Sequence, residues 1–183
     1  MSIKVLSTIS FLLFILACST PNRNYVYKTN DVFNEFGFSR SNSQEFVKDI
    51  FINKRGLKLE YESSSSPFTY LGFIGGSYWD LPVDNWVLLF KRFSISRLTI
   101  TFSNETNIDS TWNYLNNRLE ELYKWKAFRT DSTSSESSWV QLSIWEPHTC
   151  RNFYNIGLNR NFDENNIEQI KLIYYNAFNQ PEL

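Results

Sequence analysis

The chain has 183 residues, and its 18 Lys and Arg against 19 Asp and Glu give a formal net charge of −1. This balance lacks the basic excess that nucleic-acid-binding proteins show, and the length suits one domain with its own hydrophobic core. Phe, Tyr and Trp make up 17% of the residues. One core of this size does not need them all, so we expect some aromatic side chains on a partner- or ligand-binding surface.

The first residues have the layout of a secretion signal. Lys4 precedes a mostly apolar run, residues 5–17, which ends at Cys18. A spanning helix needs about 20 apolar residues, so this run is too short to remain as a membrane anchor. A charged start, a short apolar core and a small residue before the break indicate a cleaved signal peptide over residues 1–17.

The residues Ile15-Leu16-Ala17-Cys18 resemble the lipobox of bacterial lipoproteins. The resemblance covers only the leader and Cys18. It implies that the Cys18 sulfur carries a diacylglyceryl group, that the new amino terminus is acylated, and that Ser19, in place of Asp, directs the protein to the outer membrane. The alternative is an ordinary signal peptide whose mature chain begins near a cysteine. Two or three acyl chains hold a protein almost permanently, because each buried methylene contributes about 0.8 kcal/mol.

The segment after the lipid site is polar and has no periodicity. We expect residues 18–30 to be the lipidated cysteine and a flexible tether, and residues 31–183 to form a single domain. No acidic cluster follows Cys18, which favours a domain on the periplasmic side.

Two segments show helical periodicity. Residues 43–54 begin with capping side chains and place Phe46, Val47, Ile50 and Phe51 on one face. Residues 110–126 form the stronger helix, with an apolar stripe that comprises Trp112, Leu115, Leu119 and Leu122.

The strand predictions rest on alternation and apolar runs. We expect strands over residues 57–62, 68–74, 86–93, 95–102, 139–145, 153–158 and 167–175. Residues 95–102 alternate well, with Leu98, Ile100 and Phe102 on one face and Arg97, Thr99 and Thr101 on the other. We expect Ser63–Ser66 with Pro67 to end the first strand, residues 79–85 to be a loop because of Pro82, and residues 131–138 to be an exposed loop.

The order of elements is one helix, four strands, one helix and three strands, without an internal sequence repeat. It predicts an α+β fold, with a single antiparallel sheet of about six or seven strands and two helices packed on one face. Trp139 and Trp145 would then lie on the other face.

The sequence contains few groups for catalysis. His148 is the only histidine, so a zinc site that uses two or more histidines is excluded. His148 lies two residues from Cys150. A Cys-His dyad is one interpretation, but a turn histidine beside a buried thiol is the simpler one, because Cys18 is the lipid site and leaves Cys150 without a partner.

Other candidate motifs also have simpler interpretations. Gly75-Gly76-Ser77 lacks the frame of a nucleophile turn or a phosphate loop, so a glycine bend is favoured. Asp80 and Asp84 could bind calcium with Asn85, but an acidic loop is the default. Glu105 and Asp109 could be paired carboxylates of a glycosidase, although a helix cap explains Asp109 better. We therefore expect no cofactor and no metal.

The tryptophans are the remaining candidates for a site. We expect Trp86 and Trp112 in the core, and Trp79, Trp139 and Trp145 on a surface that binds a partner or ligand. The leading hypothesis is a non-enzymatic, membrane-anchored lipoprotein that binds another cell-envelope protein. The alternatives are a glycan- or small-ligand-binding lipoprotein that uses the same aromatics, and an enzyme of unrecognised type.

Overall fold

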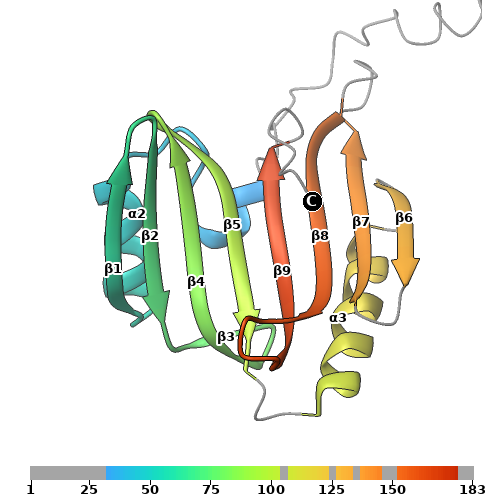
Figure 1. The fold of residues 1–183 in the computed structure, drawn as a ribbon. Coiled ribbons are helices and arrows are strands. Elements are labelled where there is room, and N and C mark those ends of the chain that lie inside the picture. Colours follow the sequence, from blue (N-terminus) through green and yellow to red (C-terminus); the bar gives the residue numbers. More distant parts are fainter. Residues whose placement is uncertain (1–31, 104–106, 124–126, 134–136, 146–151, 177–183) are drawn as a thin grey trace, which may run out of the picture.

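The computed structural model describes residues 32–103, 107–123, 127–133, 137–145 and 152–176 (Figure 1). The side chains of residues 32, 123, 127–133, 141–145, 152–154 and 176 are not described. Within these ranges the chain forms two short helices near the start, one longer helix in the middle, and nine strands of a single sheet. The predicted α+β fold with one open antiparallel sheet is confirmed, and the sheet has more strands than the six or seven expected.

The first half of the domain is a helical segment followed by an antiparallel meander. A 3-10 helix, η1 (Val32–Phe36), precedes α2 (Gln44–Asp49), which continues as a π-helix, η2 (Ile50–Lys54). The strands are β1 (Lys58–Ser65), β2 (Phe68–Ile74), the short β3 (Ser77–Tyr78), β4 (Leu81–Lys91) and β5 (Ser94–Phe102).

The second half repeats this plan. Helix α3 (Ile108–Tyr123) is followed by β6 (Ala127–Thr133), β7 (Ser137–Trp145), β8 (Asn152–Phe162) and β9 (Glu168–Asn176). The sheet order is β1-β2-β4-β5-β9-β8-β7-β6, with β3 attached to β4 (Figure 1). The two meanders therefore meet through their last strands, β5 and β9, and the topology is a twofold repeat that the sequence does not reveal.

The predicted helices are present with small changes in their limits. The Ser43 Oγ accepts a hydrogen bond from the Phe46 backbone N–H at 3.2 Å and caps α2. Asn107, rather than Asp109, caps α3, because its Oδ1 accepts from the Ser110 N–H at 3.1 Å. The expectation that Leu122 lies on the buried stripe of α3 is wrong, since Leu122 is 41% exposed.

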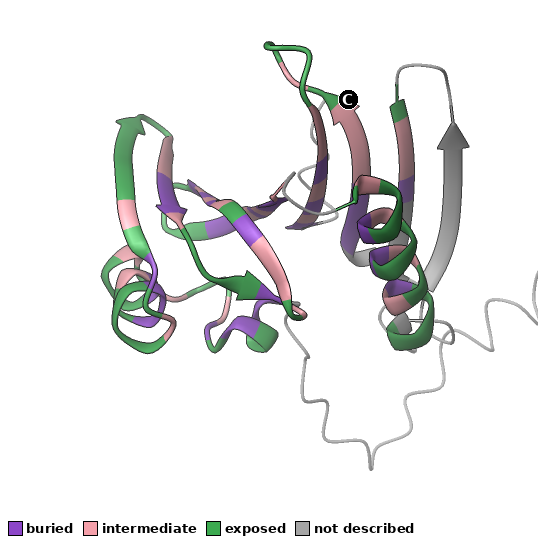
Figure 2. Cartoon of the chain, turned by 90° about the horizontal axis from the view of Figure 1, so that it is seen from below, coloured by how far each residue is buried: buried purple, intermediate pink, exposed green. Residues whose placement is uncertain are grey.

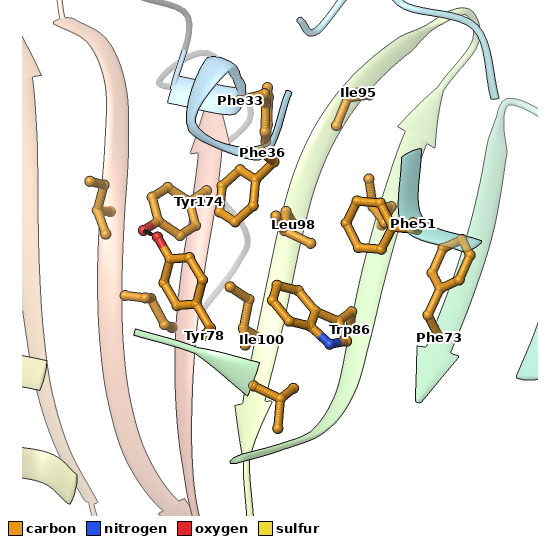
Figure 3. Close-up of a cluster of buried hydrophobic side chains, with 14 of the residues drawn as sticks. Phe33, Phe36, Phe51, Phe73, Tyr78, Trp86, Ile95, Leu98, Ile100 and Tyr174 are labelled. Carbon is orange, nitrogen blue, oxygen red and sulfur yellow. Dashed lines mark hydrogen bonds between the residues drawn. The ribbon is translucent and has the colours of Figure 1, made fainter. Parts of the chain in front are cut away.

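The core is a continuous layer of apolar side chains (Figure 3). Its centre is one ladder row that crosses the sheet through Phe73, Trp86, Ile100, Leu172 and Leu158, each of which is fully buried. Phe51 of η2 packs on this row, with its ring 4.8 Å from that of Phe73 and 5.7 Å from that of Trp86. The expectation that Trp86 is a core residue is confirmed.

Three predicted loops are strands instead. β1 runs through Ser65 because an edge strand needs only one partner, and the Ser64 and Thr69 hydroxyls pair across it at 3.2 Å. Residues 81–85 belong to β4, since the reversal is completed at Trp79 and Asp80, whose φ angles of 50° and 62° make a two-residue turn. Residues 131–133 belong to β6 and 137–138 to β7, so polar side chains there did not exclude strand.

The hairpin between β4 and β5 turns at Arg92 and Phe93, so the strand predicted to reach residue 93 ends at Lys91. Arg92 has a φ of 59°. Phe93 is 90% exposed at this turn. Strand β8 is longer than the predicted 153–158 and reaches Phe162. Among the residues that the structure describes, no helix has the length and apolarity to cross a membrane.

Candidate binding surface

The side of the sheet opposite the core row presents a second set of side chains, which we call the outer face. Because cross-strand partners share a face and neighbours along a strand alternate, the strand register defines its members. The first row contains Tyr70, Leu89, Arg97, Tyr175 and Asn155. The second contains Gly72, Val87, Thr99, Ile173 and Gly157, and the third contains Ile74, Asn85, Thr101, Lys171, Asn159 and Trp139.

Most of these side chains are partly open to solvent. Those of Leu89, Arg97, Thr99, Ile173 and Lys171 are half-buried. Figure 2 shows buried and intermediate segments along the strands. Towards β8 the face is more closed, since Tyr175 is 6% exposed and Asn155 is 0% exposed. On β4, β5 and β9 the partly open side chains are those of Asn85, Val87, Leu89, Arg97, Thr99, Lys171 and Ile173, whereas Thr101 is 3% exposed.

Two tyrosines on this face cover glycines of a neighbouring strand. A Cβ at Gly72 would collide with the Tyr61 ring, and one at Gly157 would lie 3.7 Å from the Tyr175 ring. The bare backbone at each glycine thus makes room for an aromatic ring. Burial raises the pKa of Tyr175, and burial followed by the charge of Glu60 raises the pKa of Tyr61.

The charges of the outer face are all positive among its described ladder positions. Four cations pair with residues of the outer face and therefore lie on it. The pairs are Lys58 with Ile74, Lys91 with Phe68, Arg97 with Tyr175, and Lys171 with Thr101. No Asp or Glu occupies a described ladder position there. Glu60 and Asp84 lie at strand irregularities, outside the regular ladder pairs, and Asp163 lies in the β8–β9 turn.

The three predicted surface tryptophans do not gather in one place. Trp139 lies on the outer face, half-buried, beside Asn159. Trp79 is half-buried against the core, where its ring stacks on Tyr78 at 4.6 Å and its Nε1 donates to Glu35 at 3.2 Å. The backbone of Trp145 pairs with Asn152 at a register shift, and its side chain lies outside the described part.

Trp79 belongs to a polar cluster that holds η1 against the sheet. The Tyr78 hydroxyl donates to the Glu35 carboxylate and lies 2.7 Å from the Tyr174 hydroxyl. The Arg55 guanidinium lies over the Phe36 and Trp86 rings, 5.4 and 5.9 Å from their centroids, and donates to the Glu35 carbonyl at 3.4 Å. Burial lowers the pKa of Arg55, while Tyr78 and Glu35 oppose this shift. These contacts stabilise the fold at η1, so we do not assign this cluster to binding.

The other residues considered as candidates for a site either have structural roles or lie outside the described ranges. Gly75 and Gly76 form a bend with φ angles of 89° and 78°. The Asp109 carboxylate accepts from the Arg160 Nη1 at 2.6 Å and ties α3 to β8. Within the described ranges, no group of three or more His, Cys, Asp or Glu could hold a metal ion. Cys18, Glu105, His148 and Cys150 lie outside those ranges.

Part of the outer face follows from the sequence pattern alone. The alternation of residues 95–102 placed Arg97, Thr99 and Thr101 together, opposite the apolar set. Lys171 and Ile173 join them only because β9 pairs with β5. Comparison with known proteins adds no assignment, since no family model, no curated protein and no solved structure matches this chain.

Proposed function

We propose that this protein is a non-enzymatic lipoprotein of the outer membrane, held by lipid on Cys18, whose domain binds another cell-envelope protein through the outer face. The observation that carries the proposal is the half-buried part of that face, where Leu89 pairs with Arg97 and Ile173 lies two residues from Lys171 on β9. Protein interfaces favour such a mixture of apolar groups with Tyr, Trp and Arg.

The proposal includes both helices packing on the core side of the sheet, which leaves the outer face for a partner. The contacts of Phe51 with Phe73 and Trp86 support this arrangement for the α2–η2 segment. For α3, support comes from Leu115 and Leu119, which are buried in the same apolar cluster. In Figure 2 the two helices lie on the same side of the strands, which agrees with this arrangement.

A photo-crosslinking experiment in the native host tests this function. A benzophenone amino acid at Leu89, in the middle of the outer face, should yield an adduct with one envelope protein. The matched control is Asn53, an exposed residue of η2 on the helical side. Absence of an adduct at Leu89, or the same adducts from both positions, would contradict the proposal.

A glycan ligand is the second candidate, because Trp139 shares its row with Asn159, Lys171 and Asn85. An aromatic ring beside amides is a suitable sugar site, since the ring stacks on the sugar and the amides bind its hydroxyls. Peptidoglycan fragments should then change the tryptophan fluorescence of the wild type but not of Trp139→Phe. We favour a protein partner because Val87, Leu89 and Ile173 offer no hydrogen bonds to a sugar.

A further inference from the structure

We propose that the outer face binds an acidic segment of its protein partner, with carboxylates over Arg97 and Lys171 and apolar side chains between them. This inference rests on the proposed function and specifies the chemistry of the partner. The evidence is the separation of charge between the two sides of the sheet.

Two cations on the core side, Lys48 and Arg160, have carboxylate partners. Lys48 of α2 lies 2.7 Å from Glu62 of β1, and Arg160 of β8 lies 2.6 Å from both Asp109 and Glu168. The pairs Lys48–Glu62 and Arg160–Asp109 tie helices to strands, and Arg160–Glu168 joins β8 to β9. Hydrogen bonds to these carboxylates raise the pKa of both cations. The positive charges of Lys48 and Arg160 are therefore neutralised within the chain.

The cations on the outer face are different. Neither Arg97 nor Lys171 forms an ion pair with any residue in the described ranges. Both are half-buried, so water solvates them less completely than it solvates an exposed side chain. The whole chain has a net charge of −1, so the positive face arises from the arrangement of the strands and not from the composition.

The spacing of these two cations indicates the form of the ligand. Arg97 and Thr101 lie on β5, and Thr101 pairs with Lys171 on β9. The two cations are thus about four residues apart along the strand direction, or roughly 14 Å at about 3.4 Å per residue. Thr99 and Ile173, a cross-strand pair, lie between them.

An extended acidic segment fits this surface better than a phosphate-bearing polymer. The area around Arg97 contains the aliphatic side chains of Val87, Leu89 and Ile173. Burying these side chains against apolar groups of a partner is favourable. A segment with both carboxylates and aromatic or aliphatic side chains satisfies the charges and the apolar area together. Opposite charges also accelerate association and make it sensitive to salt.

The test uses a fluorescent random copolymer of glutamate and tyrosine as the probe, with a lysine–tyrosine copolymer as its control. Fluorescence anisotropy with the full-length protein in detergent should detect binding of the acidic copolymer alone, and added salt should weaken it. The double variant Arg97→Gln/Lys171→Gln should bind about fivefold more weakly, as expected from the loss of two partly exposed charge pairs. Lys54→Gln, a cation of η2, should bind as the wild type does.

Several results would overturn the inference. Equal binding of the two copolymers would exclude charge recognition, and an equal loss in Lys54→Gln would assign the effect to net charge. Binding to phosphatidylglycerol vesicles through Arg97, without binding of the copolymer, would identify the occupant as lipid. If the Leu89 adduct forms as well in Arg97→Gln/Lys171→Gln, the acidic partner is excluded while the proposed function remains. If no Leu89 adduct forms in the wild type, the proposed function itself fails.

Discussion

The hydroxyls of Tyr78 and Tyr174 lie 2.7 Å apart in the buried core, where they join β3 of the first half to β9 of the second (Figure 3). Tyr78 also donates to the Glu35 carboxylate of η1. A hydroxyl has one proton, so Tyr174 must be the donor to Tyr78 when Tyr78 donates to Glu35. This series of hydrogen bonds, from Tyr174 through Tyr78 to Glu35, thus links both halves of the sheet to η1.

Removing the Tyr78 hydroxyl, which is central to these hydrogen bonds, should destabilise the fold. We expect Tyr78→Phe to lower the free energy of unfolding by about 2 kcal/mol, because it leaves a carboxylate and a buried hydroxyl each without one partner. Urea denaturation measures the change. Tyr70→Phe, on the half-exposed outer face, is the matched control and should change stability by less than about 0.5 kcal/mol. Equal effects of the two substitutions would contradict a structural role for these hydrogen bonds.

The bend between β2 and β3 provides a comparison of two adjacent glycines. Gly75 and Gly76 both have positive φ, so alanine at either position costs about 1 kcal/mol in backbone conformation. A Cβ at Gly76 would also lie 2.5 Å from the Leu57 Cδ2, whereas nothing lies within 4 Å of a Cβ at Gly75. We expect Gly76→Ala to be more destabilising than Gly75→Ala by about 1–3 kcal/mol in urea denaturation. Similar values would mean that Leu57 moves away without cost.

The packing of α3 can be tested with two leucines of the same helix. Leu119 is fully buried, and Leu122 is 41% exposed. Leu119→Asp should unfold the domain, because a buried carboxylate without a partner costs more than the stability of most domains of this size. Leu122→Asp should alter the melting temperature by only a few degrees. Unchanged melting of Leu119→Asp in circular dichroism would refute the packing of this face.

Alkaline pH should reveal the buried phenol of Tyr175. Burial raises its folded-state pKa, so the folded state keeps the proton at a pH where the unfolded chain has lost it. The contribution of Tyr175 is therefore complete below the ordinary tyrosine pKa of about 10 and declines as the pH rises from there through the folded-state value. In Tyr175→Phe, stability should fall less steeply above pH 10. Tyr114→Phe, at a residue that is 43% exposed, is the control, and identical slopes would contradict the prediction.

Local patterns determined several parts of this protein. The spacing of three and four residues located α3, and the period of two in residues 95–102 assigned the two faces of β5 correctly. Apolar runs located β2 and most of β4, and capping residues located α2. The lipobox resemblance at Cys18 also comes from adjacent residues alone, and it remains a prediction. In each of these cases the signal lies within a few neighbouring residues, because helices and strands place neighbours in the chain on defined faces.

The tertiary structure decided everything that depends on contact between distant residues. Strand β6 has a polar sequence, and it forms because β7 supplies its hydrogen bonds. The pairing of β5 with β9 brings Lys171 and Ile173 beside Thr101 and Thr99, and the turn at Trp79 and Asp80 sends Trp79 to the core while Trp139 lies on the outer face. No local period encodes these pairings, because the energy of a strand pair resides in backbone hydrogen bonds and side-chain contacts with residues far away in the chain.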